Sequence, residues 1–200
     1  MTVTRRERMR RALNHEPVDR IPTQVNYTRA MGRRLAAHLG VTMDELPQRL
    51  GNHLLRVDIA HEHRRSDDGR IAFDWWGVGF DTEQEGYFAA VHPLADSKDL
   101  DAFAWPDPLA PNLLDRAARI IANDGGERFV APNFGFAVFE RAWRLRGFDT
   151  YLLDMDLDPG CAGELLERIS QIQLVLIQRF LYLGVDGGYF GDDYAVSYTH

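Results

Sequence analysis

The segment 158-DPGCAGELLERISQIQLVLIQRFLYLGVDGGYFGDDY-194 decides the fold. It begins with Asp158, a residue type that caps helices, and Pro159, which is favoured at the first helical position because its missing N–H costs nothing there. Apolar residues then recur at steps of four and three at positions 165, 169, 172, 176, 180 and 183, so one continuous stripe runs along the helix until Gly184. A short apolar, glycine-rich strand and a pair of acids follow. The segment therefore predicts a capped helix leading into a strand whose carboxyl end carries carboxylates.

Upstream, the sequence alternates between the same two kinds of element. Strands are predicted at 21–25, 54–59, 129–134 and 185–190. Helices are predicted at 4–14, before the first strand, and at 30–39, 112–123 and 136–146, between the strands. Strand–helix alternation of this kind indicates right-handed βαβ units and a parallel sheet. Doubly wound folds and (β/α)₈ barrels both satisfy it. No G-x-G-x-x-G fingerprint and no phosphate-binding P-loop occurs in the sequence, which disfavours dinucleotide-binding and ATPase functions.

The stretch 70–83 has a different pattern from the rest. Its apolar residues alternate around Gly77 and Gly79, which predicts an antiparallel hairpin inserted between the parallel units. The overall expectation is thus an α/β protein with an inserted hairpin near 70–83.

Composition limits the classes of function. The chain has 200 residues, a formal net charge of −7 and one cysteine. The negative charge argues against a general nucleic-acid binder, and a single cysteine excludes an internal disulfide framework. No stretch approaches the 18 apolar residues of a membrane span. The sequence therefore predicts a soluble, cytoplasmic protein with neither nucleic-acid nor membrane partners.

Five motifs, in order along the sequence, resemble the uroporphyrinogen decarboxylase-like superfamily: RRERMRRAL (5–13), HEPVDRIP (15–22), DWWGV (74–78), WPDP (105–108) and DGGYFGDDY (186–194). The resemblance implies a (β/α)₈ barrel of the TIM type, of which 1–194 covers about the first half. It implies that 195–200, which departs from the pattern, is a non-native tail. It also implies that these 200 residues are inactive alone and that the full-length protein is a homodimer.

The resemblance assigns candidate site residues to the first two units. Arg29 and Arg33 stand where the decarboxylases hold substrate carboxylates, although the same arginines also fit the solvated face of a helix. Asp58 stands where an aspartate lies under the pyrrole nitrogens and stabilises positive charge as the ring is protonated. His53 is the rival for that place, and a salt-bridging or capping role for Asp58 is the alternative interpretation.

Three more candidates follow from the later motifs. Trp143 stands where the decarboxylases have a tyrosine near the substrate, and it offers an N–H but no hydroxyl. Asp192 is expected to act as a general acid–base and Asp193 to contact a cationic group of the substrate. An acid at 192 would repel a polycarboxylate, so a polar turn that caps a strand is the equal alternative.

The implied function is cofactor-free decarboxylation of the carboxylate side chains of a tetrapyrrole, a carbon–carbon lyase reaction. Two alternatives stay open. One is zinc-dependent methyl transfer from a corrinoid protein, whose metal ligands belong to the second half of the barrel, so that no metal ligand is assigned here. The other is a non-catalytic binding module.

Overall fold

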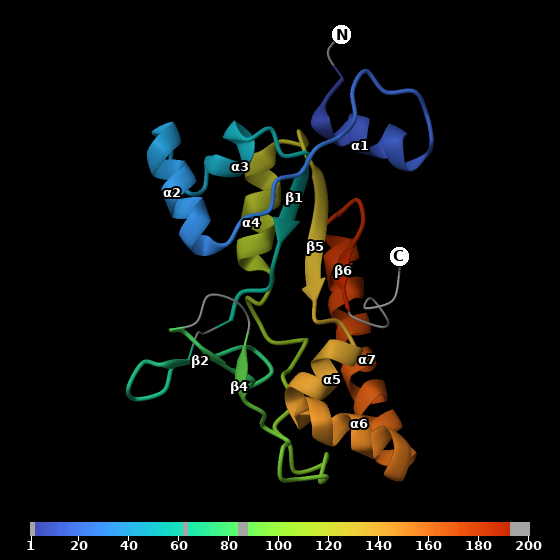
Figure 1. Ribbon diagram of the computed structural model, residues 1–200. Coiled ribbons are helices and arrows are strands. Elements are labelled where there is room, and N and C mark those ends of the chain that lie inside the picture. Colours follow the sequence, from blue (N-terminus) through green and yellow to red (C-terminus); the bar gives the residue numbers. More distant parts are fainter. Residues whose placement is uncertain (1–2, 62–63, 84–87, 193–200) are drawn as a thin grey trace.

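A parallel sheet lies at the centre of the computed structural model, which describes residues 3–61, 64–83 and 88–192 (Figure 1). Its strands are β1 (Leu54–Val57), β5 (Phe129–Gly135) and β6 (Tyr189–Gly191), in the order β1-β5-β6. The register places Val57 beside Pro132 and Asn133 beside Tyr189. Three of the four predicted parallel strands therefore share one sheet, with β5 in the middle.

Two helices cover one face of this sheet. Alternate strand residues Leu55, Val57, Val130 and Phe134 point into a core formed with α4 (Asp115–Asp124) and α7 (Pro159–Tyr182). The carboxylate of Asp158 accepts a hydrogen bond from the backbone N–H of Cys161, and Pro159 occupies the first turn, as the sequence predicts. Along α7, the apolar stripe is buried at Leu165, Ile169, Leu176 and Phe180.

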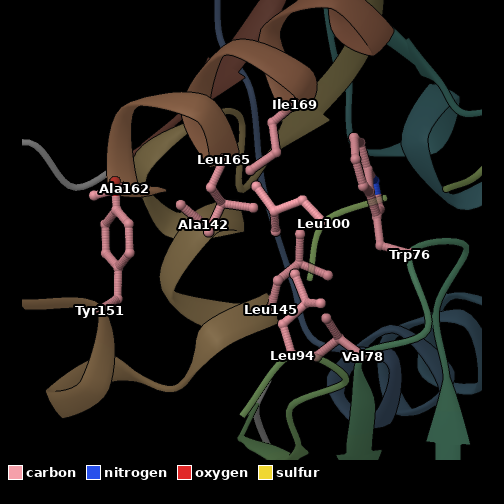
Figure 2. Packing of buried hydrophobic residues seen from close by; sticks show 10 residues of the cluster. All are labelled: Trp76, Val78, Leu94, Leu100, Ala142, Leu145, Tyr151, Ala162, Leu165 and Ile169. Atoms are coloured by element: carbon pink, nitrogen blue, oxygen red, sulfur yellow. The ribbon is translucent and has the colours of Figure 1, made fainter. Parts of the chain in front are cut away.

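A second core lies beyond the carboxyl ends of the strands. There α5 (Phe139–Arg146) and α6 (Phe148–Leu157) pack against the first half of α7. Figure 2 shows the side chains that meet in this core: Trp76, Val78, Leu94, Leu100, Ala142, Leu145, Tyr151, Ala162, Leu165 and Ile169. Because Trp76 and Val78 belong to the inserted hairpin, this core attaches the hairpin to the helices.

The predicted hairpin is present, and it is part of a small antiparallel sheet. Strands β2 (Ile71–Phe73) and β3 (Gly79–Asp81) pair with each other, and β4 (Ala89–Val91) adds to β3. Gly77 has a φ of +79°, a left-handed conformation that glycine adopts without strain. The sequence did not predict β4.

The amino-terminal helices pack around the amino end of the parallel sheet. Helix α1 (Arg5–Leu13) contacts β5, and its Arg6 and Arg10 side chains both reach the buried carboxylate of Asp186. Helices α2 (Arg29–Leu39) and α3 (Leu46–Arg49) follow and contact each other (Figure 1).

The prediction of half a (β/α)₈ barrel is wrong. The described residues form two separate small sheets, one parallel and one antiparallel, and 21–25 adds no strand to either. Ile21 is 79% exposed, so this segment does not bury the apolar side that a barrel strand needs. Its Val25 backbone instead exchanges two hydrogen bonds with the side-chain amide of Asn52. These amide contacts take the place of strand pairing, and β1 remains an edge strand.

The last predicted strand is shorter than expected. Only Tyr189–Gly191 pairs as a strand, because the backbone N–H groups of Asp186 and Gly187 both donate to the carbonyl of Val130. Residues 193–200, which include the predicted non-native tail, lie outside the described residues. Among the described helices, none is long and apolar enough to cross a membrane.

Candidate functional site at the carboxyl edge

A row of polar side chains crosses the parallel sheet at its carboxyl edge. Because strand residues alternate between faces, Arg56 and Asp58 lie opposite to the buried Leu55 and Val57. The register brings Asn133 of β5 and Tyr189 of β6 to the same row. We call Arg56, Asp58, Asn133 and Tyr189 the polar row. It lies where ligands bind in parallel α/β sheets.

Asp58 and Asn133 form the centre of the polar row. The side-chain amide of Asn133 donates a hydrogen bond of 2.9 Å to Oδ1 of Asp58, whose side chain is otherwise exposed. An ionised carboxylate only accepts hydrogen bonds, so the amide nitrogen must face it and the amide oxygen points elsewhere. That oxygen, Oδ1 of Asn133, is buried and has no partner among the described residues. The pair therefore presents one exposed acceptor, the carboxylate of Asp58.

Gly135 lies next to the side chain of Asn133. A Cβ placed on Gly135 would lie 3.6 Å from Oδ1 of Asn133, in ordinary van der Waals contact. The amide oxygen is already covered by the protein, so the exposed carboxylate of Asp58 is the acceptor of this pair that a bound molecule can reach.

Arg56 supplies the positive charge of the polar row. Its guanidinium lies 4.6 Å from the centre of the Tyr189 ring, a cation–π contact that links β1 to β6 across β5. The planar guanidinium keeps its N–H groups available for a carboxylate, which it can bind in a bidentate manner. Arg56 and Asp58 are two positions apart on one strand face, a separation of about 7 Å.

Asp192 follows β6 at the same edge of the sheet, but its carboxylate is directed at a helix. It accepts hydrogen bonds from the backbone N–H groups of Val138, Phe139 and Glu140, at 2.8, 2.9 and 2.7 Å. These N–H groups open α5, where a carboxylate also interacts favourably with the helix dipole. The described contacts give Asp192 the task of capping a helix, whereas the alternative drawn from the sequence was a polar turn that caps a strand. Its general acid–base role stays a prediction.

His53 lies at the opposite end of β1 from Asp58 and is buried. Its Nε2 is 3.2 Å from Nη1 of Arg8, and its Nδ1 is 3.2 Å from the backbone N of Thr23. Burial lowers the pKa of His53, while the contact with Thr23 raises it less. The structure thus separates His53 from the polar row and does not bring it together with Asp58.

The other predicted binding residues are spread over different parts of the molecule. Arg29 and Arg33 are exposed on α2, and among the described contacts neither forms a hydrogen bond or ion pair with Asp58. Trp143 is half-buried on α5, where its ring meets Phe148 edge-on at 5.5 Å. Asp193 lies outside the described residues. Substrate binding by these four residues remains a prediction.

Sequence reasoning missed Arg56, Asn133 and Tyr189. The signal for Arg56 was present, because it precedes Asp58 by two positions and must share its face. Asn133 and Tyr189 depend on the register between strands, which the sequence does not state. For metal binding, the part of the protein that the structure describes contains no group of three or more His, Cys, Asp or Glu side chains arranged to hold an ion.

Comparison with known proteins matches no protein family, no curated protein and no solved structure to this sequence.

Proposed function

We propose that the protein binds a pyrrole-containing polycarboxylate of the tetrapyrrole type on its polar row, and that it is a decarboxylase of the side chains of that substrate. The observation that carries the proposal is the hydrogen-bonded pair of Asp58 and Asn133. It presents an oriented carboxylate, an acceptor that suits the N–H groups of pyrroles. Arg56, on the same face, suits a carboxylate of the substrate.

Such a substrate needs no cofactor for the chemistry proposed here. Once a pyrrole ring is protonated, it can accept an electron pair. This pair comes from the bond between the acetate methylene and its carboxylate, and the bond breaks as CO₂ leaves. A proton from solvent then completes the new methyl group, and the ring loses the proton that it gained. The net change is the uptake of one proton and the release of one CO₂.

Asp58 has the properties that this chemistry requires of a neighbouring group. Its carboxylate accepts pyrrole N–H groups and stabilises the positive charge of the protonated ring. The amide of Asn133 fixes the carboxylate in place, so little reorganisation is needed as charge develops. The sequence resemblance supports the same assignment for Asp58. A cytoplasmic location is part of the proposal and is supported by the single cysteine.

The proposal is tested by titrating the protein with uroporphyrin, a stable tetrapyrrole with carboxylate side chains on every ring, and following the porphyrin absorbance. The matched control is a porphyrin with cationic substituents. We expect saturable binding of uroporphyrin with a Kd of about 100 μM or tighter, and at least tenfold weaker binding of the cationic porphyrin. Equal affinity for both porphyrins, or no binding of uroporphyrin, would contradict the proposal.

A further inference from the structure

A hollow of about 360 Å³ lies between the antiparallel sheet and the loop that follows it, away from the polar row. Aromatic side chains dominate its walls, together with Pro93 and one cation. The residues that line it are Arg64, Phe73, Asp74, Trp75, Trp76, Gly77, Pro93, Phe103 and Ala104. None of these residues belongs to the polar row. Its volume is within the range of small-molecule sites.

The walls of the hollow are fixed by the core behind them. Trp76 is buried and stands at the rim of the cluster drawn in Figure 2, so its ring cannot turn freely. Trp75 and Phe103 pack against the same cluster, and the rings of Trp75 and Trp76 meet edge-on at 5.6 Å. A ligand would therefore meet aromatic surfaces that are already in place, which lowers the entropy cost of binding.

The turn that carries both tryptophans is held by Asp74. Its Oδ1 accepts the backbone N–H groups of Trp76 and Val78, at 2.9 and 3.0 Å. Its Oδ2 forms an ion pair of 2.5 Å with Nη1 of the buried Arg141. Since Arg141 balances the charge of Asp74, this carboxylate adds no net negative charge to the hollow.

Arg64 gives the hollow a net positive charge. Its guanidinium lies 4.1 Å from the centre of the Phe73 ring, and among the described residues no carboxylate pairs with it. The side chain is exposed, so its N–H groups remain free for an anion. A planar ring placed against the aromatic walls would bring an attached anionic group next to this guanidinium.

We propose that this hollow is a second ligand site, specific for a planar aromatic molecule that carries an anionic group. The ring stacks against Trp75 and Phe103, and the anion pairs with Arg64. Aromatic stacking supplies contact area, and the uncompensated guanidinium selects the sign of the charge.

The probe is 2-naphthoate, titrated into protein labelled with ¹⁵N while the indole N–H resonances are recorded. The variants Trp75→Phe, Trp76→Phe and Trp143→Phe assign the resonances. We expect the Trp75 and Trp76 resonances to shift with saturation and that of Trp143, which lies outside the hollow, to stay in place. The uncharged analogue 2-naphthylmethanol should bind about tenfold more weakly than 2-naphthoate. The variant Arg64→Gln should likewise bind 2-naphthoate about tenfold more weakly than the unmodified protein does.

The matched control is Arg116→Gln, because Arg116 is an exposed arginine on α4 that does not line the hollow. Its affinity for 2-naphthoate should equal that of the unmodified protein. Equal binding of the acid and the alcohol, unchanged affinity in Arg64→Gln, or no shift of either tryptophan at about 10 mM 2-naphthoate would overturn the proposal. Since the two sites share no residue, the variants Arg64→Gln and Asp58→Asn report on them separately.

Discussion

The side-chain amide of Asn133 holds the carboxylate of Asp58 at 2.9 Å, across the carboxyl ends of two neighbouring parallel strands. Asp58 directly follows β1, and Asn133 lies near the end of β5, more than seventy positions later in the sequence. The bond therefore exists only when the sheet has formed in its observed register. It places an oriented charge at the edge of the sheet where ligands are expected.

We expect Asn133→Ala to weaken uroporphyrin binding about tenfold, because it removes the group that orients the carboxylate of Asp58. The change also removes a buried oxygen that has no donor among the described residues, so the melting temperature should fall little. Absorbance titration and thermal unfolding measure the two effects. Unchanged affinity together with a large loss of stability would mean that Asn133 serves only the fold.

Asp192→Ala should lower the free energy of unfolding by about 1–2 kcal/mol, since it removes the acceptor of three N–H groups at the start of α5. Asp192→Asn keeps one acceptor oxygen and should recover part of this loss. Urea unfolding followed by circular dichroism measures both variants. If Asp192→Ala unfolds at the same urea concentration as the unmodified protein, the capping task is refuted.

The burial of His53 predicts a specific dependence of stability on pH. Because burial lowers the pKa of His53 in the folded protein, the unfolded protein takes up a proton first as pH falls. The stability that His53 contributes is thus complete above about pH 6.5 and is lost as pH falls toward the lowered pKa. Urea unfolding between pH 7.5 and 5 should show a steeper fall for the unmodified protein than for His53→Gln. Parallel curves would contradict this account.

Among the carboxylates at the amino end of the parallel sheet, we expect that of Asp186 to contribute most to the free energy of unfolding. Its side chain is 1% exposed and binds Arg6, Arg10 and the backbone N–H of Val130. Asp186→Ala leaves these donors without their acceptor and should cost about 2–4 kcal/mol in urea unfolding. Asp44→Asn, at an exposed position, is the control and should cost less than about 0.5 kcal/mol.

The stability that Asp186 contributes is expected to decrease at low pH. Burial alone raises the pKa of Asp186, but the hydrogen bonds from Val130, Arg6 and Arg10 outweigh it and lower the pKa overall. The stabilisation is therefore complete above about pH 4 and disappears as pH falls below that value. Below about pH 3 the difference in stability between Asp186→Ala and the unmodified protein should shrink.

The parts of the fold that local chemistry determines were predictable. Asp158 and Pro159 define the start of α7, the predicted strand at 54–59 contains β1, and that at 129–134 covers all of β5 except its last residue. The segment 21–25 has a strand-like composition, yet distant side chains, Asn52 among them, decide its structure. Helix α6 was missed because its apolar residues are spread around the helix between aspartates: Leu153 is 59% and Leu157 75% exposed, so no one-sided stripe marks it.

For the candidate site, Asp58 was assigned by the resemblance to the decarboxylases, and the structure places it directly after β1 at the carboxyl edge of the parallel sheet. The sequence did not locate Asn133 or Tyr189, because their positions depend on which strands are neighbours and in which register. His53 was the rival of Asp58 for the same place in the site, but the four residues of β1 separate the two, so His53 lies at the opposite end of the strand.

The most direct test of the central claim is the uroporphyrin affinity of Asp58→Asn compared with that of Asp44→Asn. Both changes remove one negative charge from an exposed aspartate, so they alter long-range electrostatics alike. We predict that Asp58→Asn raises the Kd for uroporphyrin about tenfold or more with an unchanged melting temperature, because a charged acceptor is lost at the site. Asp44→Asn should leave the Kd unchanged. Equal Kd values for the two variants would contradict the assignment of Asp58 as the acceptor of the pyrrole N–H groups.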